Sequence, residues 1–147
     1  MDLRLARPED LDAIRAIVDA AYAPYVPVIG RRPGPMDDDY AALVAAGRVQ
    51  VAGTGSPEAV LVLLPEADHL LLDNIAVAPG AQGKGLGRKL VEAAAGQARA
   101  AGYDELRLYT HEKMEANIAL YTRLDFVETH RAVDKGFPRV YMTRRLA

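Results

Sequence analysis

The sequence predicts a single α/β domain of the α+β kind, spanning residues 1–147, with a mixed, mostly antiparallel sheet of about seven strands and four helices. Two observations predict this class. Short stretches rich in Val and Leu, of strand length, alternate with stretches whose apolar residues recur at helical spacing. The resulting order is β-α-α-β-β-β-α-β-α-β-β, in which one strand-helix-strand crossover interrupts an antiparallel meander.

The first third of the chain supplies one strand and two helices. Residues 3–6 alternate as a strand, and Pro8 suits the first turn of a helix that continues to Tyr22. Residues 22–35 contain four prolines and two glycines, so we expect a loop there rather than a regular element. A second helix should begin near residues 36–37 and end at Gly47.

The rest of the chain alternates strands with two more helices. Strands are expected at residues 48–52, 59–64, 70–77, 105–110, 126–131 and 140–144. Residues 53–57 have the composition of a hairpin turn, and residues 134–138 form another turn. The helices should run from Leu86 to Gly102 and over residues 115–124. The strand at 70–77 is apolar on both faces, which predicts a central place in the sheet.

Composition excludes several classes of function. The chain has no cysteine, so it has no disulfide, thiol nucleophile or thiolate metal site, and its three histidines lack ligand spacing. We therefore expect chemistry without a metal. The formal net charge of -2 gives no basic field for nucleic acid or an anionic membrane. Apolar runs are too short to span a bilayer and the start lacks a secretory pattern, so a cytoplasmic protein is expected.

The stretch at residues 70–88 has the outline of an anion site. Pro79 ends the strand, and Gly83, Gly85 and Gly87 allow a tight turn into the following helix. The unpaired N–H groups at that helix start suit a phosphate or pyrophosphate. A Walker loop does not fit, because Ala78 occupies its first glycine position and Gly85 follows the lysine. The dinucleotide fingerprint does not fit either, because the spacing is G-x-G-x-G.

The pattern Gln82-x-x-Gly85-x-Gly87, directly after a strand, resembles the acyl-CoA pyrophosphate loop of the GNAT superfamily of N-acyltransferases. A second motif, residues 117–121 with 124–126 behind it, resembles the fourth-helix pattern of the same superfamily. The resemblance covers nearly the whole chain and implies the three-layer GNAT fold. One departure is Asp125, where the family usually has Gly, but Asp tolerates left-handed dihedral angles better than most residues.

The resemblance implies a transferase that uses acetyl-CoA, or another acyl-CoA, as cosubstrate. Direct attack by a primary amine, on a small molecule or a peptide, would occur in a ternary complex. The residues expected to bind the cofactor are Ile75, Ala76, Val77, Gln82, Gly83, Lys84, Gly85, Leu86, Gly87, Arg88 and Asn117. Tyr121 is the expected general acid, since a phenol with an ordinary pKa of about 10 stays protonated at neutral pH.

The general base is less narrowly defined. Asp73 interrupts an apolar strand, where a carboxylate is costly unless it is paired, exposed or functional. Alternation would place it with Leu71, Ile75 and Val77, although a bulge could reverse its face. Glu112, His111 and a chain of water molecules stay open as alternatives.

Two other functions are consistent with the sequence. A GNAT-like domain could bind acyl-CoA as a sensor or partner module without significant turnover. An α/β domain without a cofactor would require both motifs to be coincidences. The sequence also leaves a homodimer open.

Overall fold

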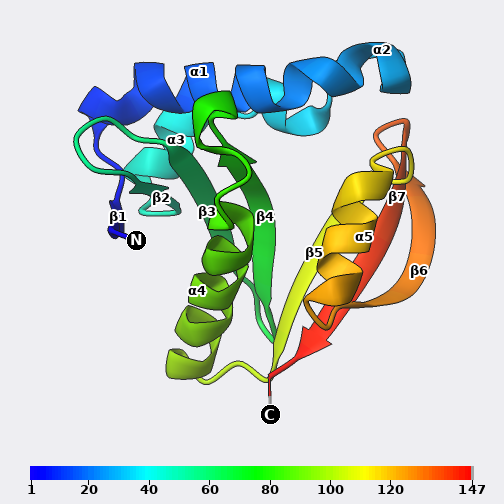
Figure 1. Ribbon diagram of the computed structural model, residues 1–147. Coiled ribbons are helices and arrows are strands. Elements are labelled where there is room, and N and C mark those ends of the chain that lie inside the picture. Colours follow the sequence, from blue (N-terminus) through cyan, green and yellow to red (C-terminus); the bar gives the residue numbers. More distant parts are fainter. Residues whose placement is uncertain (147) are drawn as a thin grey trace. The chain divides into compact units, whose positions relative to one another are not determined.

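The structure is a computed structural model that describes residues 1–146. It contains one seven-stranded sheet with the strand order β1-β2-β3-β4-β5-β7-β6 (Figure 1). The strands are β1 (Leu3–Leu5), β2 (Val49–Ala52), β3 (Ala59–Pro65), β4 (Leu70–Val77), β5 (Glu105–His111), β6 (Val127–Asp134) and β7 (Phe137–Arg145). The predicted central position of the strand at residues 70–77 is confirmed, because β4 has neighbours on both sides.

The sheet is mixed, as predicted. β1 pairs with β2, β2 with β3, β5 with β7 and β6 with β7, all antiparallel. β4 and β5 pair parallel, with Leu70 opposite Leu106 and Leu71 opposite Arg107. The crossover that parallel pairing requires is supplied by α4, which precedes β5 in the chain.

The helices are α1 (Leu11–Tyr22), α2 (Val26–Ile29), α3 (Tyr40–Ala45), α4 (Leu86–Ala100) and α5 (Glu115–Arg123). The single-turn helix α2 corrects the expectation of an irregular loop over residues 22–35. Pro24 and Pro27 are the second residues of a 3-10 turn and of α2, within the first turn, where proline's missing N–H costs no hydrogen bond. Gly30, with φ 88°, then ends α2 in the left-handed conformation.

The second predicted helix, which corresponds to α3, begins later than predicted. Met36 and Asp37 belong to a 3-10 turn, and α3 starts at Tyr40. Asp39 is the reason, because its carboxylate accepts a hydrogen bond from the backbone N–H of Ala42 at 3.0 Å and so caps the helix. The predicted stop at Gly47 is confirmed by its φ of 73° just after the helix.

The last two strands are longer than predicted, because the turn between them is tighter. Lys135 and Gly136 have φ values of 51° and 78°, which is the two-residue turn that matches the twist of paired strands. Asp134 consequently pairs with Phe137 instead of lying in the turn.

The chain divides into two compact units, which are described separately. The first comprises Met1–Leu63 and Asn74–Leu90, and its fully buried core includes Ile14 and Leu61. The second comprises Leu64–Asp73 and the residues from Val91 onward. Within the second unit, α5 lies along the strands β5, β7 and β6 (Figure 1), and Leu106 and Val140 are fully buried.

No helix in the described part of the chain is both long enough and apolar enough to cross a membrane.

Candidate functional site

The glycine-rich connection between β4 and α4 lies wholly in the first unit. After β4, residues Pro79–Ala81 form a 3-10 turn, and Gly83 and Gly85 then adopt φ values of 81° and 76°. These values need glycine or a residue that tolerates left-handed backbone. Gly87 is the second residue of α4, so the expected helix start near Leu86 is confirmed.

The outer side of this loop is open. A Cβ atom added to Gly83 or Gly85 would meet no heavy atom within 4 Å. The Gln82 side chain folds back and donates a hydrogen bond from Nε2 to the carbonyl oxygen of Val77 at 3.1 Å. The loop is therefore fastened to the end of β4 while its glycines face open space.

Positive charge gathers on the same loop. Lys84, Arg88 and Lys89 are exposed, and none of them forms an ion pair with another residue in the described range 1–146. The first N–H groups of α4, a helix of 15 residues, also lack intrahelical acceptors. These donors, the helix dipole and three unpaired cations together suit a multiply charged anion such as a pyrophosphate.

The last residues of β4 alternate in burial, with Ile75 and Val77 half-buried and Ala76 only 2 % exposed. The Tyr22 hydroxyl lies 3.5 Å from the carbonyl oxygen of Ile75. The carbonyl oxygen of Val77 accepts the hydrogen bond from the Gln82 side chain. Their expected backbone contacts with pantetheine stay a prediction.

The second motif lies on α5, in the second unit. Asn117 is half-buried, and its side chain has no hydrogen-bond partner among the residues that the structure describes. Tyr121 follows one turn later and is 9 % exposed, with its ring edge-to-face against Phe126 at 5.6 Å between centroids. Asp125 has φ 70°, so the expected left-handed turn at this departure from the family pattern is confirmed.

Asp73 lies in the second unit, at the middle of β4. Burial alternates without interruption along the strand, so Asp73 shares the half-buried set with Leu71, Ile75 and Val77, as simple alternation predicts. Its Oδ1 accepts a long hydrogen bond of 3.4 Å from the hydroxyl of Tyr109 on β5. The carboxylate is thus partly desolvated and held by a donor.

The two competing bases are in less suitable states. The backbone N–H of Lys113 donates to Nδ1 of His111 at 3.0 Å, so neutral His111 carries its proton on Nε2 and offers no free lone pair. Burial also lowers the pKa of His111. Glu112 lies 3.9 Å from Arg131 in an exposed ion pair. Neither arrangement favours proton abstraction from an amine.

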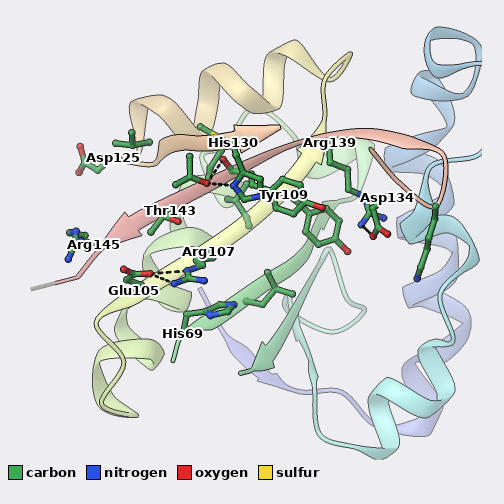
Figure 2. A pocket seen from close by; sticks show the side chains of 17 residues that line it. His69, Glu105, Arg107, Tyr109, Asp125, His130, Asp134, Arg139, Thr143 and Arg145 are labelled. Carbon is green, nitrogen blue, oxygen red and sulfur yellow. Dashed lines mark hydrogen bonds and ion pairs between the residues drawn. The ribbon is translucent and has the colours of Figure 1, made fainter. Parts of the chain in front are cut away.

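A pocket of about 1070 Å³ opens on the face of β5, β6 and β7 (Figure 2). Its walls carry the half-buried rings of Tyr109 and Tyr141, with His130, Arg139 and Arg107 around them. None of the predicted catalytic or cofactor-binding residues lines it. Tyr109 is the residue through which the pocket adjoins Asp73, because Tyr109 lines the pocket and its hydroxyl donates to the Asp73 carboxylate.

Sequence reasoning missed a buried polar network in the first unit. Asn74 is 3 % exposed, accepts a hydrogen bond from the Tyr22 hydroxyl at 2.5 Å and donates one to the Tyr40 hydroxyl at 3.0 Å. Tyr40 in turn donates to the carbonyl oxygen of Pro35 at 2.6 Å. The available signal was Asn74 itself, a polar residue in an apolar strand, beside the more conspicuous Asp73.

Within residues 1–146, no three His, Asp or Glu side chains gather in a way that could hold a metal ion.

Several solved structures share the fold. The ribosomal-protein-S18-alanine N-acetyltransferase of Escherichia coli aligns with a TM-score of 0.78 and 24% identity, over 99% of this chain and 94% of that one. A GCN5-related N-acetyltransferase of Rhodopseudomonas palustris aligns with 0.82 and 22% identity, over 99% and 95%. The PaiA N-acetyltransferase of Thermoplasma acidophilum, in complex with coenzyme A, aligns with 0.81 and 15% identity, over 98% of each chain.

No curated protein matches the sequence significantly. The family model of the GNAT acetyltransferases matches residues 15–126, which is more than half of the chain and includes both motifs. The chain therefore belongs to the GNAT family of acetyltransferases.

Proposed function

We propose that this protein transfers an acetyl group from acetyl-CoA to a primary amine, on a small molecule or a peptide, by direct attack in a ternary complex. Membership of the family implies acyl transfer from an acyl-CoA to an amine. The observation that carries the proposal is the loop before α4, where two left-handed glycines with open surroundings adjoin three cations that have no ion-pair partner within residues 1–146.

In this proposal the loop binds the pyrophosphate of the cosubstrate. The N–H groups of residues 83–88 supply donors, and the side chains of Lys84 and Arg88 supply charge. Gln82 acts indirectly, because its amide is already bonded to Val77 and holds the loop in place.

The pantetheine arm would bind to the backbone of Ile75, Ala76 and Val77 like an added strand. Asn117, on α5 in the second unit, would bind the cosubstrate with its side-chain amide, which lacks a partner among the described residues. A half-buried amide without a partner is costly unless water or a ligand satisfies it, which supports this assignment.

The chemistry requires three proton movements. Asp73 first takes the proton that the substrate ammonium must lose. The neutral amine then attacks the thioester carbonyl carbon, a C–N bond forms, the C–S bond breaks, and the electron pair of that bond moves to sulfur, which takes a proton from the Tyr121 hydroxyl. The nitrogen loses its second proton as the amide forms, and this proton restores the Tyr121 hydroxyl through solvent. Charge on the carbonyl oxygen is stabilised by backbone N–H groups of β4.

A second candidate function is acyl-CoA binding without turnover. Burial favours it, since Tyr121 is only 9 % exposed and packs against Phe126 like a core residue. The two functions are distinguished by whether the protein releases free thiol from acetyl-CoA when an amine is present.

The proposed function is tested by measuring thiol release from acetyl-CoA in the presence of panels of amines, peptides and antibiotics. Amine-dependent thiol release supports transfer. Stabilisation by acetyl-CoA without release from any panel supports the binding module, and a ligand at 100 times its Kd should stabilise by about 2.7 kcal/mol.

The loop assignment has its own matched control. Gly85→Val should abolish binding of coenzyme A in calorimetry, whereas Gly85→Asn, which tolerates positive φ, should retain part of it. Gly55 has a similar φ of 87° and equally open surroundings, but lies in the turn between β2 and β3. Gly55→Val should therefore reduce only stability. Equal affinity in Gly85→Val and the parent protein would reject the phosphate loop.

A further inference from the structure

Tyr22, the last residue of α1, is tied to β4 by a short hydrogen bond within the first unit. Its hydroxyl donates to Oδ1 of Asn74 at 2.5 Å, and Asn74 is 3 % exposed. The amide nitrogen of Asn74 donates in turn to the hydroxyl of Tyr40, which is 2 % exposed. The phenol of Tyr22 is therefore fixed by a buried polar pair, whereas the Tyr22 residue as a whole is half-buried.

The same hydroxyl lies at the edge of β4 that faces away from β3. The backbone N–H of Ala78 donates to the carbonyl oxygen of Glu58, just before β3. In a trans peptide the C=O of Val77 points opposite to that N–H, and the C=O of Ile75, two residues back, points the same way as that of Val77. The Tyr22 hydroxyl lies 3.5 Å from this oxygen of Ile75. It is therefore close to the edge along which an added strand would bind.

The direction of the pantetheine arm follows from the place of the glycine-rich loop. The loop comes directly after β4, so an arm that starts from a pyrophosphate on residues 83–88 runs back along the strand, past Val77 toward Ile75. The thioester is at the far end of this arm. The acyl group would thus lie near Ile75, beside the phenol of Tyr22.

We propose that Tyr22 sets the length of the acyl group, because its phenol occupies the space that a chain longer than acetyl would need. This inference rests on the proposed function, in which the arm binds along β4. A butyryl group extends two carbons beyond an acetyl group and would have to displace a ring that Asn74 holds in place. One methylene in such a pocket is worth about 10- to 200-fold in selectivity. Acetyl-CoA is accepted in this proposal, and butyryl-CoA is excluded.

Calorimetry with coenzyme A, acetyl-CoA and butyryl-CoA tests the inference without knowledge of the acceptor. The parent protein should bind acetyl-CoA at least about tenfold more tightly than butyryl-CoA. Tyr22→Ala removes the ring and should bring the ratio of the two dissociation constants close to one. Its affinity for coenzyme A, which has no acyl group, should stay close to that of the parent.

Further variants separate the ring from its hydrogen bond. Tyr22→Phe loses the bond to Asn74 but keeps the ring, so it should retain most of the preference for acetyl-CoA. Tyr22→Leu has a shorter side chain and should relax the preference, which provides a second test if Tyr22→Ala does not fold. A purely structural role of Tyr22 would lower stability in these variants without changing the ratio. Thermal unfolding shows which variants are folded.

Tyr25→Ala is the matched control. Tyr25 is another half-buried tyrosine, three residues later, and its hydroxyl has no hydrogen-bond partner within residues 1–146. The ratio of dissociation constants should therefore be the same in Tyr25→Ala as in the parent.

The outcomes are distinct. A ratio that falls in Tyr22→Ala and persists in Tyr22→Phe supports the inference. A parent that binds butyryl-CoA as tightly as acetyl-CoA overturns the inference and leaves the proposed function intact, as does an equal ratio in the parent and a folded Tyr22→Ala. Failure of the proposed transfer is seen elsewhere, as acetyl-CoA that binds but releases no thiol with any amine, and the binding ratio still decides the inference.

Discussion

Asp73 and Asn74 are neighbours on β4, yet their polar groups differ in burial and in the length of their hydrogen bonds. Asn74 is 3 % exposed, and both its oxygen and its nitrogen bond to tyrosine hydroxyls at 2.5 and 3.0 Å. Asp73 is half-buried and accepts a long bond of 3.4 Å from Tyr109. A buried amide with two short bonds stabilises a structure, whereas a half-buried carboxylate is the kind of group that the proposed proton transfer requires. We infer that Asn74 serves the fold and Asp73 the reaction.

Asp73→Asn should produce the largest effect. It replaces a carboxylate by an amide of the same shape, so a base that accepts the ammonium proton is lost. We expect the rate of acetyl transfer to fall by about 10²-fold, while the free energy of unfolding changes by no more than about 1 kcal/mol, because the amide oxygen of asparagine can still accept from Tyr109. Rapid-quench kinetics and urea unfolding measure the two quantities. A large loss of stability would instead place Asp73 with Asn74 among the structural residues.

Asn74→Leu should show the reverse pattern. It leaves the Tyr22 hydroxyl without its short bond and deprives Tyr40 of a donor, which should lower the free energy of unfolding by about 2–3 kcal/mol. Asn117→Leu is the matched control, because Asn117 has no such bonds within residues 1–146. It should change stability by less than about 0.5 kcal/mol and weaken acetyl-CoA binding. Equal loss of stability in the two variants would contradict the structural role of Asn74.

Asp10 extends the comparison to a buried charged group, whose replacement should change the free energy of unfolding less than that of Asn74 does. The guanidinium of Arg4 donates to both of its oxygens at 2.8 and 2.9 Å, and the backbone N–H of Arg7 donates at 2.7 Å. The hydrogen bonds from Arg4 are the largest cause that lowers the pKa of Asp10 to about 2.

Because the pKa is lower in the folded state, this stabilisation is complete above the unfolded value of about 4. It is lost as the pH falls through about 2. Asp10→Asn should cost about 1.5 kcal/mol at neutral pH, and the difference from the parent should shrink between about pH 4 and 2. Urea unfolding at several pH values measures it. A difference that does not vary with pH would mean that packing, rather than charge, accounts for the loss.

Much of the fold follows from local signals in the sequence. The apolar run of β4, the glycine after α3 and the aspartate that replaces glycine at residue 125 each specify local backbone, and the structure agrees at all three places. The prediction of a loop over residues 22–35 was wrong, because two of the prolines lie in the first turns of helical segments. Composition alone does not distinguish such positions from a loop.

The contacts around the candidate site were beyond local reasoning. Tyr109 meets Asp73 across 36 residues, and Asn74 meets Tyr22 across 52, so each depends on how elements pack. Arg139 reaches the Tyr109 ring only because of the register between β5 and β7. A strand pattern specifies which residues share a face, but the register also depends on turns and on the neighbouring strand.

The catalytic claim depends most directly on Tyr121, and the decisive quantity is the single-turnover rate of Tyr121→Phe. The variant removes one hydroxyl and keeps the ring that packs against Phe126. If the hydroxyl protonates the leaving thiolate, the rate should fall by roughly 10²-fold or more, with the affinity for acetyl-CoA close to that of the parent. An unchanged single-turnover rate would contradict the claim, assign Tyr121 to packing, and move the proton donor to water or to the ammonium of the acceptor.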